Sequence, residues 1–119
     1  MALQKVGLGT VTRVGIGSTV PVLTVGSAKT CYIRSIICHN IDTVNSSTIK
    51  IHIVPNSGGS PGTASSINQL AQLSIQPTDT YFFELAYPIT LSSDNDTIQV
   101  YNSSTTDAVN VLILGDKEV

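Results

Sequence analysis

Short segments in which apolar and polar residues alternate, each followed by turn-forming residues, constrain this sequence more than any other feature. In SSTIKIHIVP (46–55), three isoleucines alternate with Lys50 and His52. Because successive side chains of a strand point to opposite faces, this alternation predicts a strand that directs its isoleucines into a core and Lys50 and His52 into solvent. The sequence is therefore expected to form β-sheets.

The same pattern recurs along the chain and predicts an all-β protein. Clusters of Gly, Pro, Asn, Asp and Ser separate the segments, as is typical of a sandwich or barrel. The expected strands cover residues 18–25, 29–41, 46–55, 79–85, 87–92, 96–103 and 107–115. Residues 65–75 fit both a helical face and a strand, and a strand is favoured; residues 56–63 are expected to form a surface loop. We predict an antiparallel two-sheet β-sandwich, jelly-roll or Ig-like, with about seven or eight strands.

The apolar faces of these strands define a predicted core. Trp is absent and aromatic residues make up 5% of the chain, so aliphatic side chains must fill this core. Each large aliphatic side chain contributes ~1.5–3 kcal/mol when it is fully buried. The expected members are Ile33 and Ile37, Ile49, Ile51 and Ile53, Ile98 and Val100, and Val109, Val111 and Ile113.

Charge is scarce and scattered, which bears on the kinds of partner. Charged residues make up 12% of the 119 residues, and the formal net charge is −2. The basic residues do not cluster, so we expect no nucleic-acid surface. No apolar run reaches the ~18 residues of a membrane span, so we expect no membrane partner. Few charges protect the strand edges, which favours a constitutive assembly, expected to be a homo-oligomer with a trimer as one option.

The stretch TCYIRSIICHN concentrates both cysteines and one of the two histidines. On a regular strand Cys31 and Cys38 point to opposite faces and lie ~23 Å apart, too far for a disulfide. Cys31 and His39 share a face but are separated by ~26 Å. If the next strand returns as a hairpin, His52 lies opposite Ile36 rather than beside His39. The pattern therefore predicts two buried free thiols, with neither a metal site nor a nucleophile–base pair.

No other grouping of residues predicts catalysis. Asp94, Asn95 and Asp96 offer oxygen ligands to a hard cation, but a tight turn before a strand is favoured. Glu84 lies inside YFFEL and is expected on the solvent side of a strand. The glycines near the N-terminus lack the Lys–Ser pair of a P-loop and the strand–helix context of a dinucleotide loop. We predict a non-enzymatic protein with no catalytic residue, no cofactor and no metal.

Residues 1–19 are predicted to form a Gly-rich N-terminal arm, followed by a β-sandwich domain over residues 20–119. The segment carries several glycines and few charges, yet its apolar residues suit the addition of an extended strand to a neighbour's sheet edge. The candidate partner-docking residues are Val6, Leu8, Val11, Val14 and Ile16. The alternative, which the sequence leaves open, is that these residues form the first strand of the protein's own sandwich.

Three segments carry a resemblance to a known group of proteins. KTCYIRSIICHNIDTVNSSTIKIHIVPNSGG resembles a strand pair, followed by a Gly/Ser loop, in small β-sandwich virion proteins of tailed bacteriophages. YPITLSSDNDTIQVYNS (87–103) and VNVLILG (109–115) are similar to their later strands. The resemblance covers about residues 20–115 and lies in diffuse patterns of strands and turns.

The resemblance implies a non-enzymatic structural protein of a phage virion, assembled in the host cytoplasm. A capsid decoration (cement) protein that stabilises the shell by binding the major capsid protein is the first expectation. A tail- or neck-associated protein that binds other virion proteins is the alternative within the group. The resemblance implies no catalytic residue.

A receptor- or carbohydrate-binding module is the alternative of a different class. Sugar-binding faces usually present exposed aromatic side chains, and this chain has no Trp and four Tyr. Tyr81, Tyr87 and Tyr101 lie in or beside expected strands and are predicted to belong to the core or to an interface. The composition therefore favours the structural role.

Overall fold

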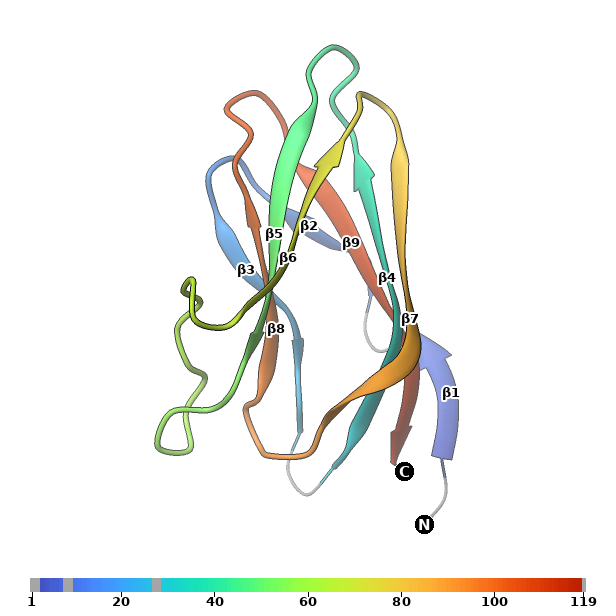
Figure 1. Ribbon diagram of the computed structural model, residues 1–119, viewed down its shortest axis with the longest axis vertical. Coiled ribbons are helices and arrows are strands. Elements are labelled where there is room, and N and C mark those ends of the chain that lie inside the picture. The colour runs from blue at the N-terminus through green and yellow to red at the C-terminus, as the bar shows by residue number, and fades with distance from the viewer. Residues whose placement is uncertain (1–2, 8–9, 27–28, 119) are drawn as a thin grey trace.

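The computed structural model describes residues 3–7, 10–26 and 29–118, and these residues form two antiparallel sheets packed face to face (Figure 1). This arrangement confirms the predicted all-β sandwich. The strands are β1 (Leu3–Gly7), β2 (Thr12–Val14), β3 (Thr19–Thr24), β4 (Cys31–Asn40), β5 (Ser47–Val54), β6 (Gln69–Ile75), β7 (Thr80–Leu91), β8 (Thr97–Asn102) and β9 (Val109–Glu118).

The strand order is that of a jelly roll. One sheet has the order β1-β9-β4-β7, and β2 also pairs with β9; the other has the order β3-β8-β5-β6. β2 pairs with the first part of β9 and β1 with its last part, so the two short strands share one position at the edge of the sheet. Counted together as one strand, they make each sheet four strands wide. The order then differs from the Ig-like ABED and CFG sheets, and it matches the double-sheet jelly roll.

Several predicted strands are confirmed, and two local predictions are wrong. Residues 69–75 form β6, as favoured for the ambiguous segment. The separate strands expected at 79–85 and 87–92 are one continuous strand, β7. β4 and β5 do not form a hairpin: β4 pairs with β7 and β9, and β5 pairs with β6 and β8 in the other sheet. In a jelly roll the connection after β4 crosses between sheets, so His52 does not lie opposite Ile36.

The predicted core is confirmed except at Ile37. The register of β4 shifts between Ile33 and Ser35 against both of its neighbours, which marks a β-bulge at Arg34. The extra residue reverses which side chains face inward, so Ile33 and Ile36 are fully buried whereas Ile37 is only partly buried and lies outside the core cluster. The other expected core residues are buried or pack against the buried cluster.

The same bulge corrects the prediction that the two cysteines point to opposite faces. Cys31 precedes the bulge and Cys38 follows it, and both belong to the buried core cluster. Both are free thiols, as predicted. They still lie seven positions apart along the strand, so the shared face does not bring them within disulfide reach.

Both prolines that fall within strands lie at sheet edges. Pro21 is in β3 and Pro88 is in β7, and each of these strands ends its sheet. Proline has no N–H to donate to a second neighbour, so it is tolerated there and not in a central strand. Their positions agree with the strand order.

The segment predicted as an arm contributes two strands to the sheet. β1 and β2 pair with β9 of the same chain, and Val14 is fully buried in the core cluster. Val11 and Ile16 are 60% and 53% exposed. Leu8 lies outside the described residues, and of Val6 only the backbone is described. The described backbone thus corresponds to the alternative in which the segment extends the protein's own sandwich.

Candidate functional site

The cysteines and histidines of the sequence do not gather into one site. Burial raises the pKa of Cys38 to about 12 and also raises the pKa of Cys31. His39 lies on the other face of β4, where its Nδ1 is 2.9 Å from Thr80 Oγ1. His52 is in the opposite sheet. Among the described residues, no group of three or more His, Cys, Asp or Glu could hold a metal ion.

The Asp94–Asn95–Asp96 turn is used for internal hydrogen bonds. Asp96 Oδ1 accepts from the backbone N–H and the side-chain amide of Asn56, at 2.9 and 3.2 Å. Asp96 Oδ2 accepts from Ser93 N–H at 3.2 Å. Asn95 adopts φ 64°, a left-handed conformation that Asn tolerates, and donates to the Gly59 carbonyl at 2.7 Å. The turn therefore holds the loop after β5 against the start of β8, as a structural turn does.

At the end of the sandwich where β4, β6 and β8 finish, three loops lie together (Figure 1), and Asp42 joins them. Asp42 accepts hydrogen bonds from the hydroxyl of Thr106 and from the backbone N–H groups of Val44 and Asn45. These bonds, the one from Thr106 first, lower the pKa of Asp42 from 3.8 to about 2. The carbonyl of Asp42 in turn accepts from Thr78 N–H at 2.9 Å. Asp42 thus links these loops through both its carboxylate and its backbone carbonyl.

Two buried asparagines complete the hydrogen bonding at this end. Asn40 donates to the carbonyls of Asn45 and Ile75 at 3.0 and 3.1 Å. Asn102 donates to the carbonyls of Val14 and Asp107 at 3.1 and 3.0 Å. Buried backbone carbonyls need such donors because water cannot reach them. These amides thus link the ends of β4 and β8 to neighbouring backbone segments at this end of the sandwich.

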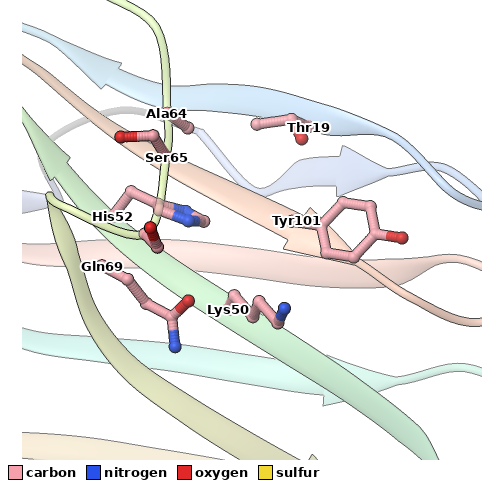
Figure 2. A pocket seen from close by; sticks show the side chains of 8 residues that line it. Thr19, Lys50, His52, Ala64, Ser65, Gln69 and Tyr101 are labelled. Carbon is pink, nitrogen blue, oxygen red and sulfur yellow. The ribbon is translucent and has the colours of Figure 1, made fainter.

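A polar hollow of about 290 Å³ lies on the outer face of the sheet that contains β5 and β8 (Figure 2). Figure 2 shows Lys50 and Tyr101 on neighbouring strands, with the Lys50 ammonium 5.9 Å from the centre of the Tyr101 ring. The loop before β6 passes over His52, which is 5% exposed. The lining residues are Thr19, Lys50, His52, Ala64, Ser65, Ser66, Gln69 and Tyr101.

The prediction that His52 faces solvent is therefore wrong, although its side chain does point away from the core. The covering loop is held by Gln99, whose side-chain amide donates to the Gly62 carbonyl at 3.0 Å. Gly62 approaches β5 closely: a Cβ at this position would lie 2.5 Å from the Pro55 carbonyl oxygen. A glycine is thus required for the loop to fold back over the sheet. The resulting hollow is lined by hydroxyl, amide, ammonium, imidazole and phenol groups.

The free edge of β7 is the most exposed apolar surface on a described strand. β7 ends its sheet, and Tyr81, Phe82 and Tyr87 are 40%, 60% and 86% exposed. Tyr81 and Tyr87 are therefore not core residues, and Tyr101 is only partly buried beside the hollow. Glu84, exposed as predicted, is the single charged side chain in this strand. A long edge strand with so little charge is a template for pairing with another strand.

The backbone of β7 shows which groups are available at this edge. Asn40 N–H donates to the Asp79 carbonyl at 3.0 Å, and the register continues from His39↔Thr80 to Ser35↔Glu84. In an antiparallel ladder alternate residues direct both polar groups to the same neighbour. Tyr81 and Phe83 therefore face β4, whereas Thr80, Phe82 and Glu84 direct their N–H and C=O groups away from it. The Thr80 N–H is held by the Asp79 carboxylate at 2.9 Å.

An apolar stripe on the outer face of this sheet continues from the β7 edge. Phe82 is paired with Ile37, and Ile37 is paired with Leu112 on β9. The bulge at Arg34 places Ile37 on this outer face, where it and Leu112 are partly exposed. The stripe therefore crosses three strands and ends at the free edge.

Comparisons with protein families and curated sequences give no relative from which a function could be taken. No protein-family model and no curated protein sequence matches the chain. Within the described part of the chain, no helix is long and apolar enough to cross a membrane.

Neither the polar hollow nor the aromatic edge follows from the pattern of the sequence. The hollow depends on the loop that covers His52, and this loop does not belong to any of the alternating segments. The edge depends on which strand ends the sheet, which alternation does not specify. One signal was visible in advance: residues 80–91 contain four aromatic residues, Tyr81, Phe82, Phe83 and Tyr87, and the single charge of Glu84.

Proposed function

We propose that this protein is a non-enzymatic structural component of a phage virion, and that it acts as a capsid decoration (cement) protein bound to the major capsid protein. The observation that carries this proposal is the β7 edge, with its exposed aromatic side chains and outward-facing backbone groups. Such an edge is a liability for a free monomer, because it invites uncontrolled pairing. It is suited to a protein that is covered by other subunits in an assembly.

Two further observations support the proposal. The segments that resemble phage virion proteins form β4, β5, the last part of β7, β8 and β9, and these strands contribute to both sheets. The jelly roll is also a fold of viral capsid domains. Fold alone does not define function, since lectins and other proteins share it, so the edge surface and the resemblance must be combined with a direct test.

The test is to quantify the protein in purified phage particles by mass spectrometry. A decoration protein is expected at a copy number comparable to that of the major capsid protein or a fixed fraction of it. A copy number matching a tail or neck ring would indicate the tail- or neck-associated role instead. Absence of the protein from purified particles would contradict a virion role of any kind.

The polar hollow favours a second candidate function, the binding of a saccharide. Tyr101 offers an aromatic ring, and Lys50, His52 and Gln69 offer polar groups around a space of about 290 Å³. An aromatic ring with a few convergent polar groups suits a small polar ligand. A glycan array tests this function: binding that is lost in Tyr101→Ala would support it, and no binding by the folded protein would reject it.

A further inference from the structure

The β7 edge pairs with β4 in two regular segments, residues 80–84 and 89–91, and the geometry of the longer one defines how the edge can pair. Residues 80–84 continue in register with β4, but pairing then jumps from Ser35↔Glu84 to Ile33↔Ile89. Residues 85–88 of β7 therefore bulge out opposite Arg34. Such a bulge interrupts regular pairing at an edge, so the longest uninterrupted segment that can accept another strand is residues 80–84.

We infer that the occupant of this edge is a second copy of the same chain, joined by antiparallel pairing of residues 80–84 about a twofold axis at Phe82. This inference deepens the proposed function, since it specifies how one surface of the assembly is covered. It goes beyond that function in naming the partner strand and the register. Both copies would then contribute to one continuous sheet through β7.

The axis at Phe82 is the one that pairs all five residues of the segment. In this register Phe82 lies opposite its own copy, Tyr81 lies opposite Phe83 of the second copy, and Thr80 lies opposite Glu84 of the second copy. Directly opposite residues share a face of the sheet. Phe82 pairs with the outward-facing Ile37, whereas Tyr81 and Phe83 pair with Cys38 and Ile36 of the core. Aromatic side chains therefore meet on both faces.

The backbone groups match this register as well. Phe82 directs its N–H and C=O away from β4, so it can exchange two hydrogen bonds with Phe82 of the second copy. The Glu84 N–H faces the Thr80 carbonyl of the second copy, and symmetry repeats this bond. These four bonds use groups that no described hydrogen bond engages. The Thr80 N–H can join when it is released from Asp79.

Electrostatics distinguish this register from its neighbours. Glu84 is the only charge in β7, and an axis at Glu84 would place two carboxylates face to face, which is destabilising. With the axis at Phe82, the Glu84 of each copy lies beside the Thr80 hydroxyl of the other copy. Within its own chain, this hydroxyl lies 2.9 Å from His39 Nδ1. The apolar stripe of Phe82, Ile37 and Leu112 also becomes continuous across the two copies. A twofold contact of this kind is closed, so the assembly does not grow into a fibre through this edge.

The oligomeric state of the full chain tests the inference. We expect a concentration-dependent dimer in sedimentation velocity, and Phe82→Lys should weaken it by about thirtyfold or more, the effect typical of a central contact residue. Tyr87→Lys is the matched control, since Tyr87 is 86% exposed on the same strand but lies in the bulge. A wild-type protein that stays monomeric at all concentrations, or a dimer that Phe82→Lys leaves intact, would overturn the inference.

Cross-linking tests the register. Phe82→Cys should form a disulfide-linked dimer under mild oxidation, because opposite Cα atoms in a hydrogen-bonded pair are ~5.5 Å apart. Glu84→Cys should not, since its copy lies four residues away along the strand. The native thiols are buried and do not compete. Equal cross-linking of both variants would contradict the Phe82 axis.

A monomer that is nevertheless found in particles would reject this inference alone, and a dimer absent from particles would reject only the proposed function.

Discussion

At the scale of single residues, the bulge at Arg34 has the largest consequence. Arg34 Nε donates to Asp116 Oδ2 at 2.7 Å, and the Asp116 side chain is 3% exposed whereas that of Arg34 is 56% exposed. A buried carboxylate is costly unless a cation or hydrogen-bond donors neutralise it. The ion pair spans 82 positions in the sequence, so the alternation within β4 carries no sign of it. The bulge decides which face Ile36, Ile37 and Cys38 occupy.

The two thiols provide a prediction at this scale. Burial raises the pKa of Cys38 to about 12, and the reactive form of cysteine is the thiolate. We therefore expect alkylation of the folded protein by iodoacetamide, at a pH near the ordinary cysteine pKa of about 8.5, to be far slower than that of the denatured chain. Intact mass spectrometry measures it. Rapid modification of two thiols in the folded state would contradict their burial.

Asp42 provides a prediction about acid stability. Its pKa falls from 3.8 in the unfolded chain to about 2 in the fold, so the unfolded state binds the proton more readily. The stabilising contribution of ionised Asp42 is present above the unfolded pKa and is lost as the pH falls toward about 2. We expect Asp42→Asn to flatten the loss of stability in this window. Denaturant unfolding at several pH values measures it, with Glu84→Gln as the exposed control.

At the scale of elements, β4 and β7 show how a strand can obey alternation and still depart from it. β4 alternates on both sides of Arg34, but odd-numbered residues face inward before the bulge and even-numbered residues face inward after it. β7 is continuous over 12 residues, yet it pairs in two parts on either side of its bulge. Each irregularity lies opposite the other, so the two strands deform together. The outer apolar stripe of Phe82, Ile37 and Leu112 and the regular pairing segment 80–84 both result from this shared deformation.

A pair of adjacent substitutions tests the inward face of β4 after the bulge. Ile36→Asp should prevent folding, because an unpaired buried carboxylate costs several kcal/mol against a total stability of about 5–15 kcal/mol. Ile37→Asp should be tolerated much better, since Ile37 is partly exposed on the outer face. Thermal unfolding of the two variants measures the difference. The reverse order of stability would mean that β4 has no bulge at Arg34.

At the scale of the whole molecule, β9 connects the N-terminal strands to the rest of the jelly roll. It pairs with β1 and β2 on one side and with β4 on the other. Both sheets are thus completed by strands that are distant in sequence. The N-terminal segment is part of this architecture, while its exposed Val11 and Ile16 remain available for contact with a neighbour.

Deletion of residues 2–17 tests the role of this segment. The structure leads us to expect a loss of several kcal/mol in the free energy of unfolding, because β9 loses the strands along one side and the core loses Val14. Denaturant unfolding measures this loss. A truncated protein that keeps its stability but no longer joins the particle would instead support a docking arm. Full stability together with normal binding would contradict both roles.

The local properties of this protein follow from its amino-acid pattern alone. Alternation predicted the strands and most of their inward residues, and the wide spacing of Cys31 and Cys38 sufficed to predict free thiols. The tertiary structure decided which strand lies beside which, because alternation states that a residue faces inward but not which strand is its neighbour. It also decided the bulge at Arg34, the cover over His52 and the exposure of Phe82. Each of these depends on contacts between residues that are distant along the chain, and no local pattern records such contacts.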